Sequence, residues 1–244
     1  MAKQLPIDPQ LMERTVVDIA AAAFKNARSH LTSAQAVLDA QQWPKAFSFA
    51  ALGLEEVGKA ALCMMMLAMP PAVREEFRSD FAKAFTSHEA KTEAAHLVLG
   101  MVADAVPASL QQLQDDVVAS ARRTHAVKLS GLYVDYTDTG TLLLPDTISE
   151  IDARLMVTTL TTALAQSRDA EAAVADDPDA YLDALHQWQD DMDFDALGTD
   201  IEKNPDQFLT QVRAFVRDDI PPPACLLGTQ LSGRLSEADA PTKS

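Results

Sequence analysis

The sequence predicts an all-α protein, and three observations support this fold class. Of the 244 residues, 48% are hydrophobic, with much Ala, Leu and Met, few β-branched runs and only 8 Gly, a composition that favours helices over strands. Apolar residues recur at three- and four-residue spacing along most of the chain. Pro residues fall between these periodic segments, as they do at helix boundaries. The length is sufficient for one main domain with an appendage.

The most apolar stretch, residues 47–69, contains three charges that need partners. Its other residues are almost all Ala, Leu, Met, Phe, Val or Cys, so the predicted helix is apolar nearly all round and runs through the interior. On a helical wheel, Lys59 falls between Glu55 and Glu56. Because an unpaired buried charge is costly, this stripe should face polar groups from other helices. It is either a structural ion-pair cluster or a functional pocket.

The N-terminal half of the chain divides at its Pro and Ser residues. Pro9 follows an Asp, as at the first position of a helix, and Pro44 and Pro70 limit the apolar central helix. Ser87 is placed as an N-cap. The first two helices should form an antiparallel pair, because the link between them is short. We predict helices at about 9–40, 44–69, 72–85 and 88–105.

The next segments change character once before helix resumes. A helix is predicted from about 108 to 131, and residues 132–148 follow with aromatic and β-branched residues, a Gly in a Thr-rich turn and a Pro. We expect an ordered loop or a short hairpin there. Ser149 and Asp152 then form a capping-box-like start for a helix that continues to about residue 174.

The chain beyond an Asp-Asp-Pro boundary near residue 177 is predicted to be a C-terminal helical addition. Its two amphipathic stretches, 179–192 and 205–218, are separated by an acidic region. From Ile220 onward, three consecutive Pro and a Ser-, Gly- and Ala-rich end indicate an irregular tail. The predicted divisions are therefore a main bundle at 1–175, a helical addition at 176–219 and a tail at 220–244.

Charge limits the partners of this chain. Its net charge is −16 at pH 7 with a pI near 4.5, which opposes non-specific attraction to nucleic acid. Any contact with RNA must therefore be local. One concentrated basic stretch contains Arg122, Arg123, His125 and Lys128, although such a run also suits a solvated helix end. We take Arg122, Arg123 and Lys128 as candidate binding residues.

Other features predict a cytoplasmic protein without a membrane partner. No run of eighteen apolar residues is uninterrupted, and the first residues lack the pattern of a secretory signal. Cys63 and Cys225 make neither a disulfide framework nor a zinc cluster, which fits a reducing compartment. We expect no metal and no cofactor.

Two further polar clusters complete the candidate residues. His88 and Lys91 lie one turn apart on one helix face, and the neutral form of a histidine there suits a general base. In residues 128–135, alternation near the end would place Tyr133 and Asp135 on one side. Taken separately, both clusters are also typical of capping or solvated residues.

Together, the order and residue types of these blocks resemble the AbiV family of abortive-infection proteins, which act in bacterial defence against phage. The resemblance covers about residues 20–175. It rests on L-E-E-x-G-K at 54–59, S-H-x-x-K at 87–91, K-x-x-G-L-Y-V-D at 128–135, Pro145 and I-S-E at 148–150. AbiV proteins look related to the HEPN superfamily, whose members are antiparallel α-helical bundles, often dimeric, and commonly ribonucleases or toxin-like effectors. The resemblance implies an HEPN-like bundle that limits phage growth through RNA or the translation machinery.

The chain departs from the usual HEPN nuclease in one motif. That signature is an Arg followed by four to six residues and a His, and no pair in this sequence has the spacing. Arg78 lies too far before His88, and Arg123 lies too close to His125. Whether the protein is an enzyme therefore stays open, with ribonuclease activity as the catalytic hypothesis.

The same clusters define an alternative site, in which Glu56 or His88 acts as base, lysines hold a phosphate and Tyr133 or Asp135 orients it. We expect these groups to lie together, enclosed by at least three segments. The competing hypothesis is an internal polar network that holds the 132–148 loop on the bundle. The candidate catalytic residues are Glu55, Glu56, Lys59, His88, Lys91, Tyr133 and Asp135, and the candidate binding residues are Lys128, Arg122 and Arg123.

A dimetal oxidase is the third class considered. Glu93 and His96 form an E-x-x-H pair, as in ferritin-like bundles. Such a site needs a second pair, and the candidate, Asp183 with His186, lies outside the region of resemblance. We therefore predict no metal site.

These arguments converge on a cytoplasmic, AbiV-type abortive-infection effector that acts on RNA or the translation machinery. The alternative is a non-catalytic sensor or binding module that recognises a phage protein or a nucleotide through the same pocket. We expect a homodimer, because Phe77, Phe81, Phe85 and the Met run at 64–66 provide more apolar surface than one small bundle covers. A phage protein is the expected trigger.

Overall fold

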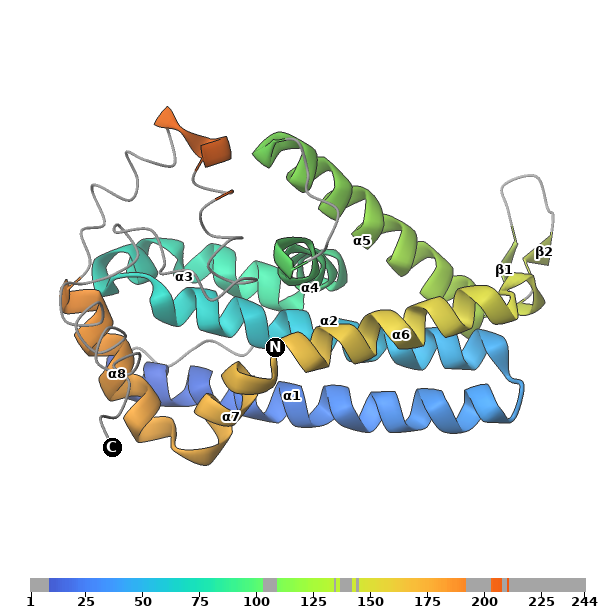
Figure 1. The fold of residues 1–244 in the computed structure, drawn as a ribbon, viewed down its shortest axis with the longest axis horizontal. Helices are drawn as coiled ribbons and strands as arrows, with labels where there is room; N and C mark the ends of the chain where they lie inside the picture. Colours follow the sequence, from blue (N-terminus) through green and yellow to red (C-terminus); the bar gives the residue numbers. More distant parts are fainter. Residues whose placement is uncertain are drawn as a thin grey trace, which may run out of the picture.

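The computed structural model describes residues 9–102, 109–133, 135–136, 142–143, 145–191, 203–207 and 210, and the described part is built almost entirely of α-helices (Figure 1). This confirms the predicted all-α class. The elements in chain order are α1 Pro9–Asp39, α2 Trp43–Ala68, α3 Pro71–Thr86, α4 His88–Val102, α5 Leu110–Leu132, β1 Asp135–Tyr136, β2 Leu142–Leu143, the 3-10 helix η1 Pro145–Thr147, α6 Glu150–Gln166, α7 Arg168–Asp176 and α8 Pro178–Asp191.

The long helices α1 and α2 form the predicted antiparallel pair (Figure 1). The link between them turns at Gln41, whose φ of 59° is left-handed. The Gln41 and Gln42 amides donate to the carbonyls of Leu38 and Val37, both at 2.9 Å, which satisfies the last turn of α1. Pro44 then lies in the first turn of α2, where its missing N–H costs nothing.

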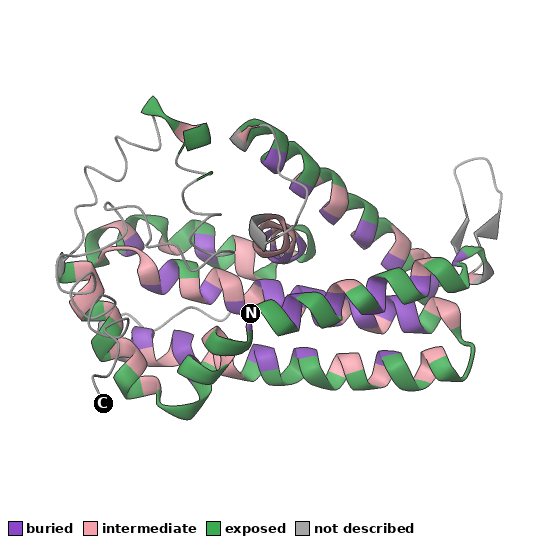
Figure 2. Cartoon of the chain, in the orientation of Figure 1, coloured by how far each residue is buried: buried purple, intermediate pink, exposed green. Residues whose placement is uncertain are grey.

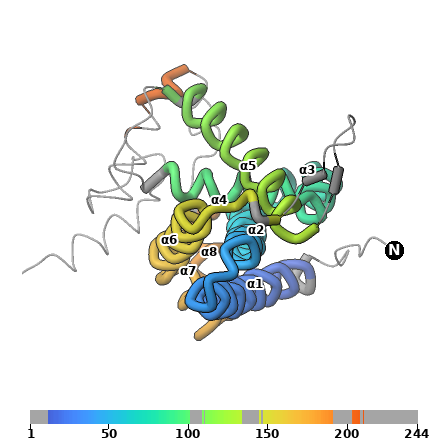
Figure 3. Tube along the Cα trace, turned by 90° about the vertical axis from the view of Figure 1, so that its right-hand side faces the viewer, coloured from blue at the N-terminus to red at the C-terminus, as the bar shows by residue number. Residues whose placement is uncertain are grey.

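Helix α2 runs through the interior, as its sequence predicts. It packs against α1, α4, α5 and α6, and Figure 3 shows it enclosed among them. Its side chains are buried on several faces, so the purple colour in Figure 2 is concentrated along it and on the faces turned toward it. Leu54, Val57 and Leu67 belong to the main core cluster. The predicted charges on α2 therefore lie among other helices rather than in solvent.

The boundaries of α3 and α4 follow the predicted signals. Pro71 begins α3, and the Ser87 hydroxyl accepts from the Ala90 amide at 3.2 Å, which caps α4. The predicted end of α4, near residue 105, lies outside the described residues. Ser109 caps α5 by accepting from the Gln112 amide at 3.1 Å.

A short hairpin follows α5, within the predicted 132–148 segment. Strands β1 and β2 pair antiparallel, with Asp135 opposite Leu143 and Tyr136 opposite Leu142. The capping box at the start of α6 is also confirmed, because Ser149 and Asp152 satisfy each other's backbone amides at 3.1 and 3.2 Å.

The predicted helix from Ser149 to about residue 174 is wrong in one respect, since the chain turns at Ser167. Helix α6 ends at Gln166 and α7 begins at Arg168. The turn allows α7 to lie along α1, where Val174 is fully buried and Glu171 forms an ion pair with Arg28. Burial and pairing with a distant helix therefore override the local helical pattern.

Helix α8 confirms the helix predicted at 179–192 and packs against the end of α2 that is farther from the hairpin (Figure 1). Its Tyr181, Leu182 and Leu185 are partly buried against the main core. The second predicted helix, 205–218, falls largely outside the described residues, of which 203, 205–207 and 210 are helical, and the 220–244 tail lies outside them entirely. The predicted division at residue 175 stays a prediction.

None of the helices in the described ranges combines the length and the apolar character needed to cross a membrane.

Candidate functional site

Glu55 is the meeting point of three helices. The residue is only 3% exposed and lies on the stretch of α2 that faces α4 and α5. One carboxylate oxygen, Oε1, accepts from the buried Lys128 ammonium of α5, and the other, Oε2, lies 2.7 Å from Nδ1 of His88 on α4. The structure therefore brings one residue of each predicted block into direct contact.

Helices α2 and α4 approach so closely because of Gly58. A Cβ added to this residue would lie 1.6 Å from the backbone oxygen of Lys91, so only glycine fits. This approach places the first turn of α4, with His88 and Lys91, beside Glu55. The L-E-E-x-G-K block thus encodes both the carboxylate and the missing side chain that admits its partner helix.

The end of α5 is held against the start of α2. The Ser48 hydroxyl lies 3.2 Å from the carbonyl oxygen of Lys128 and 2.9 Å from that of Pro44. A Cβ on Gly131 would lie 2.6 Å from the Ser48 hydroxyl oxygen, so a larger residue there would displace this contact. These contacts fix the backbone from which Lys128 reaches Glu55.

Lys91 is a buried cation without a direct anionic partner. Only 8% of the residue is exposed, and its ammonium makes no hydrogen bond or ion pair with any residue in the described part of the chain. Burial lowers the pKa of Lys91, an effect that attraction to Glu55 opposes. A negatively charged group that binds beside Lys91 would offset the free-energy cost of keeping this desolvated ammonium charged.

A second imidazole lies against His88. The ring centroids of His88 and His125 are 5.7 Å apart, with an interplanar angle of 25°. The His88 side chain is 54% exposed although its Nδ1 is held by Glu55, so its other nitrogen, Nε2, is the one left for a ligand. The Nδ1 atom of His125 is buried and has no hydrogen-bond partner among the described residues. We call Glu55, His88, Lys91, His125 and Lys128 the Glu55 cluster.

His125 is a member of the Glu55 cluster that the sequence analysis missed. It was noted as part of a basic stretch and not as a site residue. The available signal was its spacing, because His125 lies three positions before Lys128 and therefore on the same face of α5.

Glu56 and Lys59 lie beside the cluster rather than in it. They form an ion pair with each other, and the Lys59 ammonium lies 5.8 Å from the centre of the Phe85 ring. Their side chains are 15% and 21% exposed. Lys59 therefore pairs with Glu56 of the same helix, whereas Glu55 pairs with Lys128 of α5.

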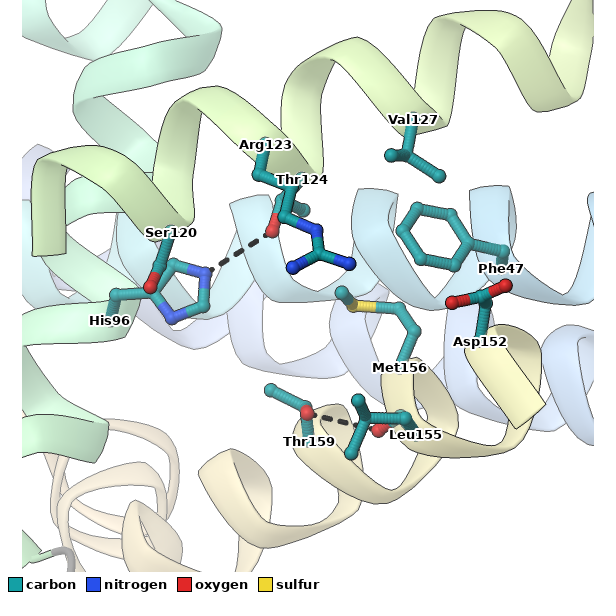
Figure 4. A pocket seen from close by; sticks show the side chains of 10 residues that line it. All are labelled: Phe47, His96, Ser120, Arg123, Thr124, Val127, Asp152, Leu155, Met156 and Thr159. Atoms are coloured by element: carbon teal, nitrogen blue, oxygen red, sulfur yellow. Dashed lines mark hydrogen bonds between the residues drawn. The ribbon is translucent and has the colours of Figure 1, made fainter. Parts of the chain in front are cut away.

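The predicted residues at the end of α5 are less closely joined to this centre. Tyr133 is 61% exposed, and no hydrogen bond, ion pair or ring contact within the described residues links its side chain to the Glu55 cluster. The backbone of Asp135 lies in β1, and its side chain is outside the described part. Arg122 and Arg123 are exposed on α5, and Arg123 turns toward a separate pocket (Figure 4).

The residues of the dimetal alternative lie apart. His96 pairs with the Thr124 hydroxyl at 3.3 Å, and His186 pairs with Glu13 at 2.9 Å. Among the described residues, no three His, Cys, Asp or Glu side chains gather closely enough to hold a metal ion.

A second buried carboxylate has the same kind of partners as Glu55. Glu13 on α1 accepts from the buried Arg74 of α3 through Oε1 and from His186 of α8 through Oε2. The Arg74 Nε also donates to the Met69 carbonyl at 2.8 Å. The sequence analysis did not identify this network, because Arg74 lies in a polar run typical of an exposed helix face.

The described part of the chain is thus an antiparallel α-helical bundle whose central helix carries a buried Glu that meets a His from α4 and a Lys from α5. Residues 15–165 match the family model HEPN_AbiV, described as AbiV. Because this match covers more than half of the 244 residues, the chain belongs to the AbiV family. Membership suggests abortive-infection defence against phage. No curated protein and no solved structure matches the chain.

Proposed function

We propose that the chain acts in abortive infection by cleaving RNA at the Glu55 cluster. The observation that carries this proposal is the half-exposed His88, whose Nδ1 is fixed by a buried carboxylate while its Nε2 remains for a ligand. A histidine oriented in this way is suited to take the proton of an RNA 2′-hydroxyl. Lys128 neutralises the other oxygen of Glu55 and holds the carboxylate in place.

The remaining cluster residues supply the other requirements of the reaction. When His88 takes the proton, the 2′-oxygen bonds to phosphorus and the bond from phosphorus to the 5′-oxygen breaks, which leaves a 2′,3′-cyclic phosphate. The 5′-oxygen then needs a proton, which the adjacent His125 in its protonated form donates. Lys91, buried beside His88, provides the positive charge for the phosphate.

Assembly and trigger belong to the same proposal. We propose a cytoplasmic homodimer that engages RNA or the translation machinery and responds to a phage protein. The apolar surface differs from the expected one, because Phe81 and Met66 are buried inside the bundle. Met65 and Phe77 remain exposed, and Ile151 is 78% exposed at the start of α6. These exposed residues are the candidate contacts of a partner.

The test is incubation of the purified chain with total cellular RNA, phage RNA and tRNA, with and without a metal chelator. Specific cleavage is expected, and His88→Ala should reduce its rate by about a hundredfold or more, the usual contribution of general acid–base catalysis. The matched control is His186→Ala, which removes a similarly exposed histidine that also contacts a buried glutamate. Cleavage that His88→Ala leaves intact would reject the assigned site.

A non-catalytic binding module is the second candidate. The Glu13, Arg74 and His186 network favours it, because a buried glutamate with a buried cation and a half-exposed histidine also occurs there between packed helices. The same arrangement at Glu55 can therefore hold helices together without taking part in a reaction. In this case the protein would bind RNA or a phage protein without cleavage. Binding that His88→Ala and Lys91→Met abolish, with intact RNA recovered, would favour this function over the enzyme.

A further inference from the structure

A pocket of about 210 Å³ opens between α5 and α6 and contains no residue of the Glu55 cluster (Figure 4). The Phe47 ring from α2 and Met156 from α6 form apolar parts of its lining. Figure 4 shows the side chains of Arg123 from α5 and Asp152 from α6 directed into the space between these helices. The pocket therefore combines an aromatic ring, a cation and an anion.

The cation and the anion each keep hydrogen-bonding capacity for a ligand. The Arg123 guanidinium has no hydrogen bond or ion pair with any residue in the described ranges. Asp152 accepts both Ser149 donors at one oxygen, Oδ2, with the backbone N–H at 3.1 Å and the hydroxyl at 2.6 Å, so Oδ1 is left over. Hydrogen bonds from Ser149, aided by the charge of Arg123, lower the pKa of Asp152, which is therefore ionised at neutral pH.

A neutral polar pair lies on the α4 side of the pocket. Burial lowers the pKa of His96, which keeps its ring uncharged at neutral pH. Its Nε2 lies 3.3 Å from the Thr124 hydroxyl. The opposite charges of Arg123 and Asp152 balance, so the pocket suits a ligand that is uncharged within it and carries donors and acceptors on different edges.

We infer that this pocket binds a guanine base. Arginine pairs with the O6 and N7 acceptors of guanine, and a carboxylate such as that of Asp152 accepts from its N1–H and N2 amino donors. The planar base would lie against Phe47 and Met156, as unstacked bases do on aromatic and apolar side chains. The volume is below the 300–1,000 Å³ typical of drug-sized ligands, so the base enters and its sugar and phosphate stay outside.

Two sources share this chemistry, namely a free guanine nucleotide and a guanosine within single-stranded RNA. Only the second source rests on the proposed ribonuclease function, for which the pocket would select the base near the cleaved bond. Binding of the base itself does not depend on catalysis at the Glu55 cluster.

Calorimetric titration of the full chain tests the inference with GMP, IMP and AMP, and with single-stranded RNA pentamers that contain one G or no G. IMP is GMP without the N2 amino group, so GMP should bind roughly tenfold more tightly than IMP, the value of a lost specific base contact. If the G pentamer binds more tightly than GMP, RNA is the source of the base. If GMP binds at least as tightly as the G pentamer, the free nucleotide is the source. Equal affinity for GMP, IMP and AMP, or no binding of any probe at millimolar concentration, would overturn the inference.

Variants assign the discrimination to named side chains. Asp152→Asn should remove the preference for GMP over IMP, and Ser149→Ala should retain it, because it weakens the cap of α6 without removing the carboxylate. Arg123→Gln should weaken GMP binding roughly tenfold. An equal loss in Arg122→Gln, which removes the same charge from the same helix outside the pocket, would show that net charge and not the pocket binds the nucleotide.

The two proposals can fail separately. GMP binding without RNA cleavage would reject the ribonuclease and retain the guanine pocket. RNA cleavage that depends on His88, together with equal affinity for GMP, IMP and AMP in the titration, would reject the pocket and retain the ribonuclease.

Discussion

His88 through Nδ1 and His186 through Nε2 each contact a different buried glutamate. His88 meets Glu55 at 2.7 Å and His186 meets Glu13 at 2.9 Å, while the second oxygen of each glutamate holds a buried Lys or Arg. Their surroundings differ. His88 lies with a second imidazole and an unpaired lysine, whereas the shallow pocket at His186 is lined by Arg14 together with Asp179 and Asp183. Of these two sites, the one at His88 is therefore the one that favours an anionic ligand.

The buried Glu55–Lys128 pair predicts a large loss of stability when one partner is removed. Lys128→Met should lower the free energy of unfolding by about 3–5 kcal/mol, because it leaves Glu55 buried without its cation. The double change Glu55→Leu with Lys128→Met should recover much of that loss, since apolar replacements of a buried pair are tolerated. Urea denaturation followed by circular dichroism measures both values. If Lys128→Met unfolded like the natural chain, the pair would not be a stabilising element.

Gly58→Ala should disturb the site by pushing α4 away from α2. The added methyl would meet the Lys91 backbone oxygen at 1.6 Å, and a backbone cannot rotate away, so the unfolding free energy should fall by about 1–3 kcal/mol or more. Gly53→Ala is the control, because its nearest neighbour is the end of the Leu160 side chain, at 2.5 Å. Thermal melts compare the two variants, and a Gly53→Ala protein that is the less stable one would contradict this account.

Lys91→Met should stabilise the protein and impair its function. Burial lowers the folded-state pKa of Lys91 below the value of 10.5 that it has when unfolded, so the unfolded chain binds more protons between the two values. The contribution of Lys91 to stability therefore rises as pH approaches 10.5 and is lowest at neutral pH. Lys91→Met should be the more stable protein at pH 7, and its advantage should shrink with rising pH.

Chemical denaturation between pH 7 and pH 10 checks this prediction. Lys83→Met, which removes an exposed lysine of α3, controls for the loss of one positive charge. An advantage of Lys91→Met that grows with pH would have the wrong sign and would contradict the burial argument.

The proposed homodimer predicts self-association through the exposed apolar residues. Light scattering at micromolar concentration should give twice the 26.4 kDa chain mass. Ile151→Lys should shift the mass toward the monomer if α6 forms the contact, and Phe77→Lys should do so if α3 forms it. A monomeric natural chain would remove dimerisation from the proposal.

Helix positions could be predicted from the sequence because their signals are local. Pro71, Ser87 and the Ser149–Asp152 capping box fix helix ends through interactions within one turn, and the structure confirms all of them. The turn at Ser167 could not be predicted in this way, because its cause is the packing of Val174 on another helix.

The pairing inside the site was only partly predictable. The helical wheel places Lys59 between both carboxylates, but the direction of its side chain lets it pair with Glu56. Glu55 instead pairs with Lys128, which is 73 residues away in sequence. Such a choice depends on how closely α5 approaches α2, which no local pattern records. Resemblance to a family supplied the block that contains Lys128, whereas His125 lies just before that block and was indicated only by its three-residue spacing from Lys128.

The Gln189 amide of α8 donates to the carbonyls of Leu67 and Met69, at 2.7 and 2.9 Å, where α2 ends. During synthesis on the ribosome, these two oxygens are made more than a hundred residues before the side chain that satisfies them. Before α8 has left the exit tunnel, Arg74 of α3 is already available to donate to the Met69 carbonyl, and the Gln189 amide joins the Leu67 and Met69 carbonyls later. The end of α2 thus gains its contact with α8 more than a hundred residues after α2 itself is made.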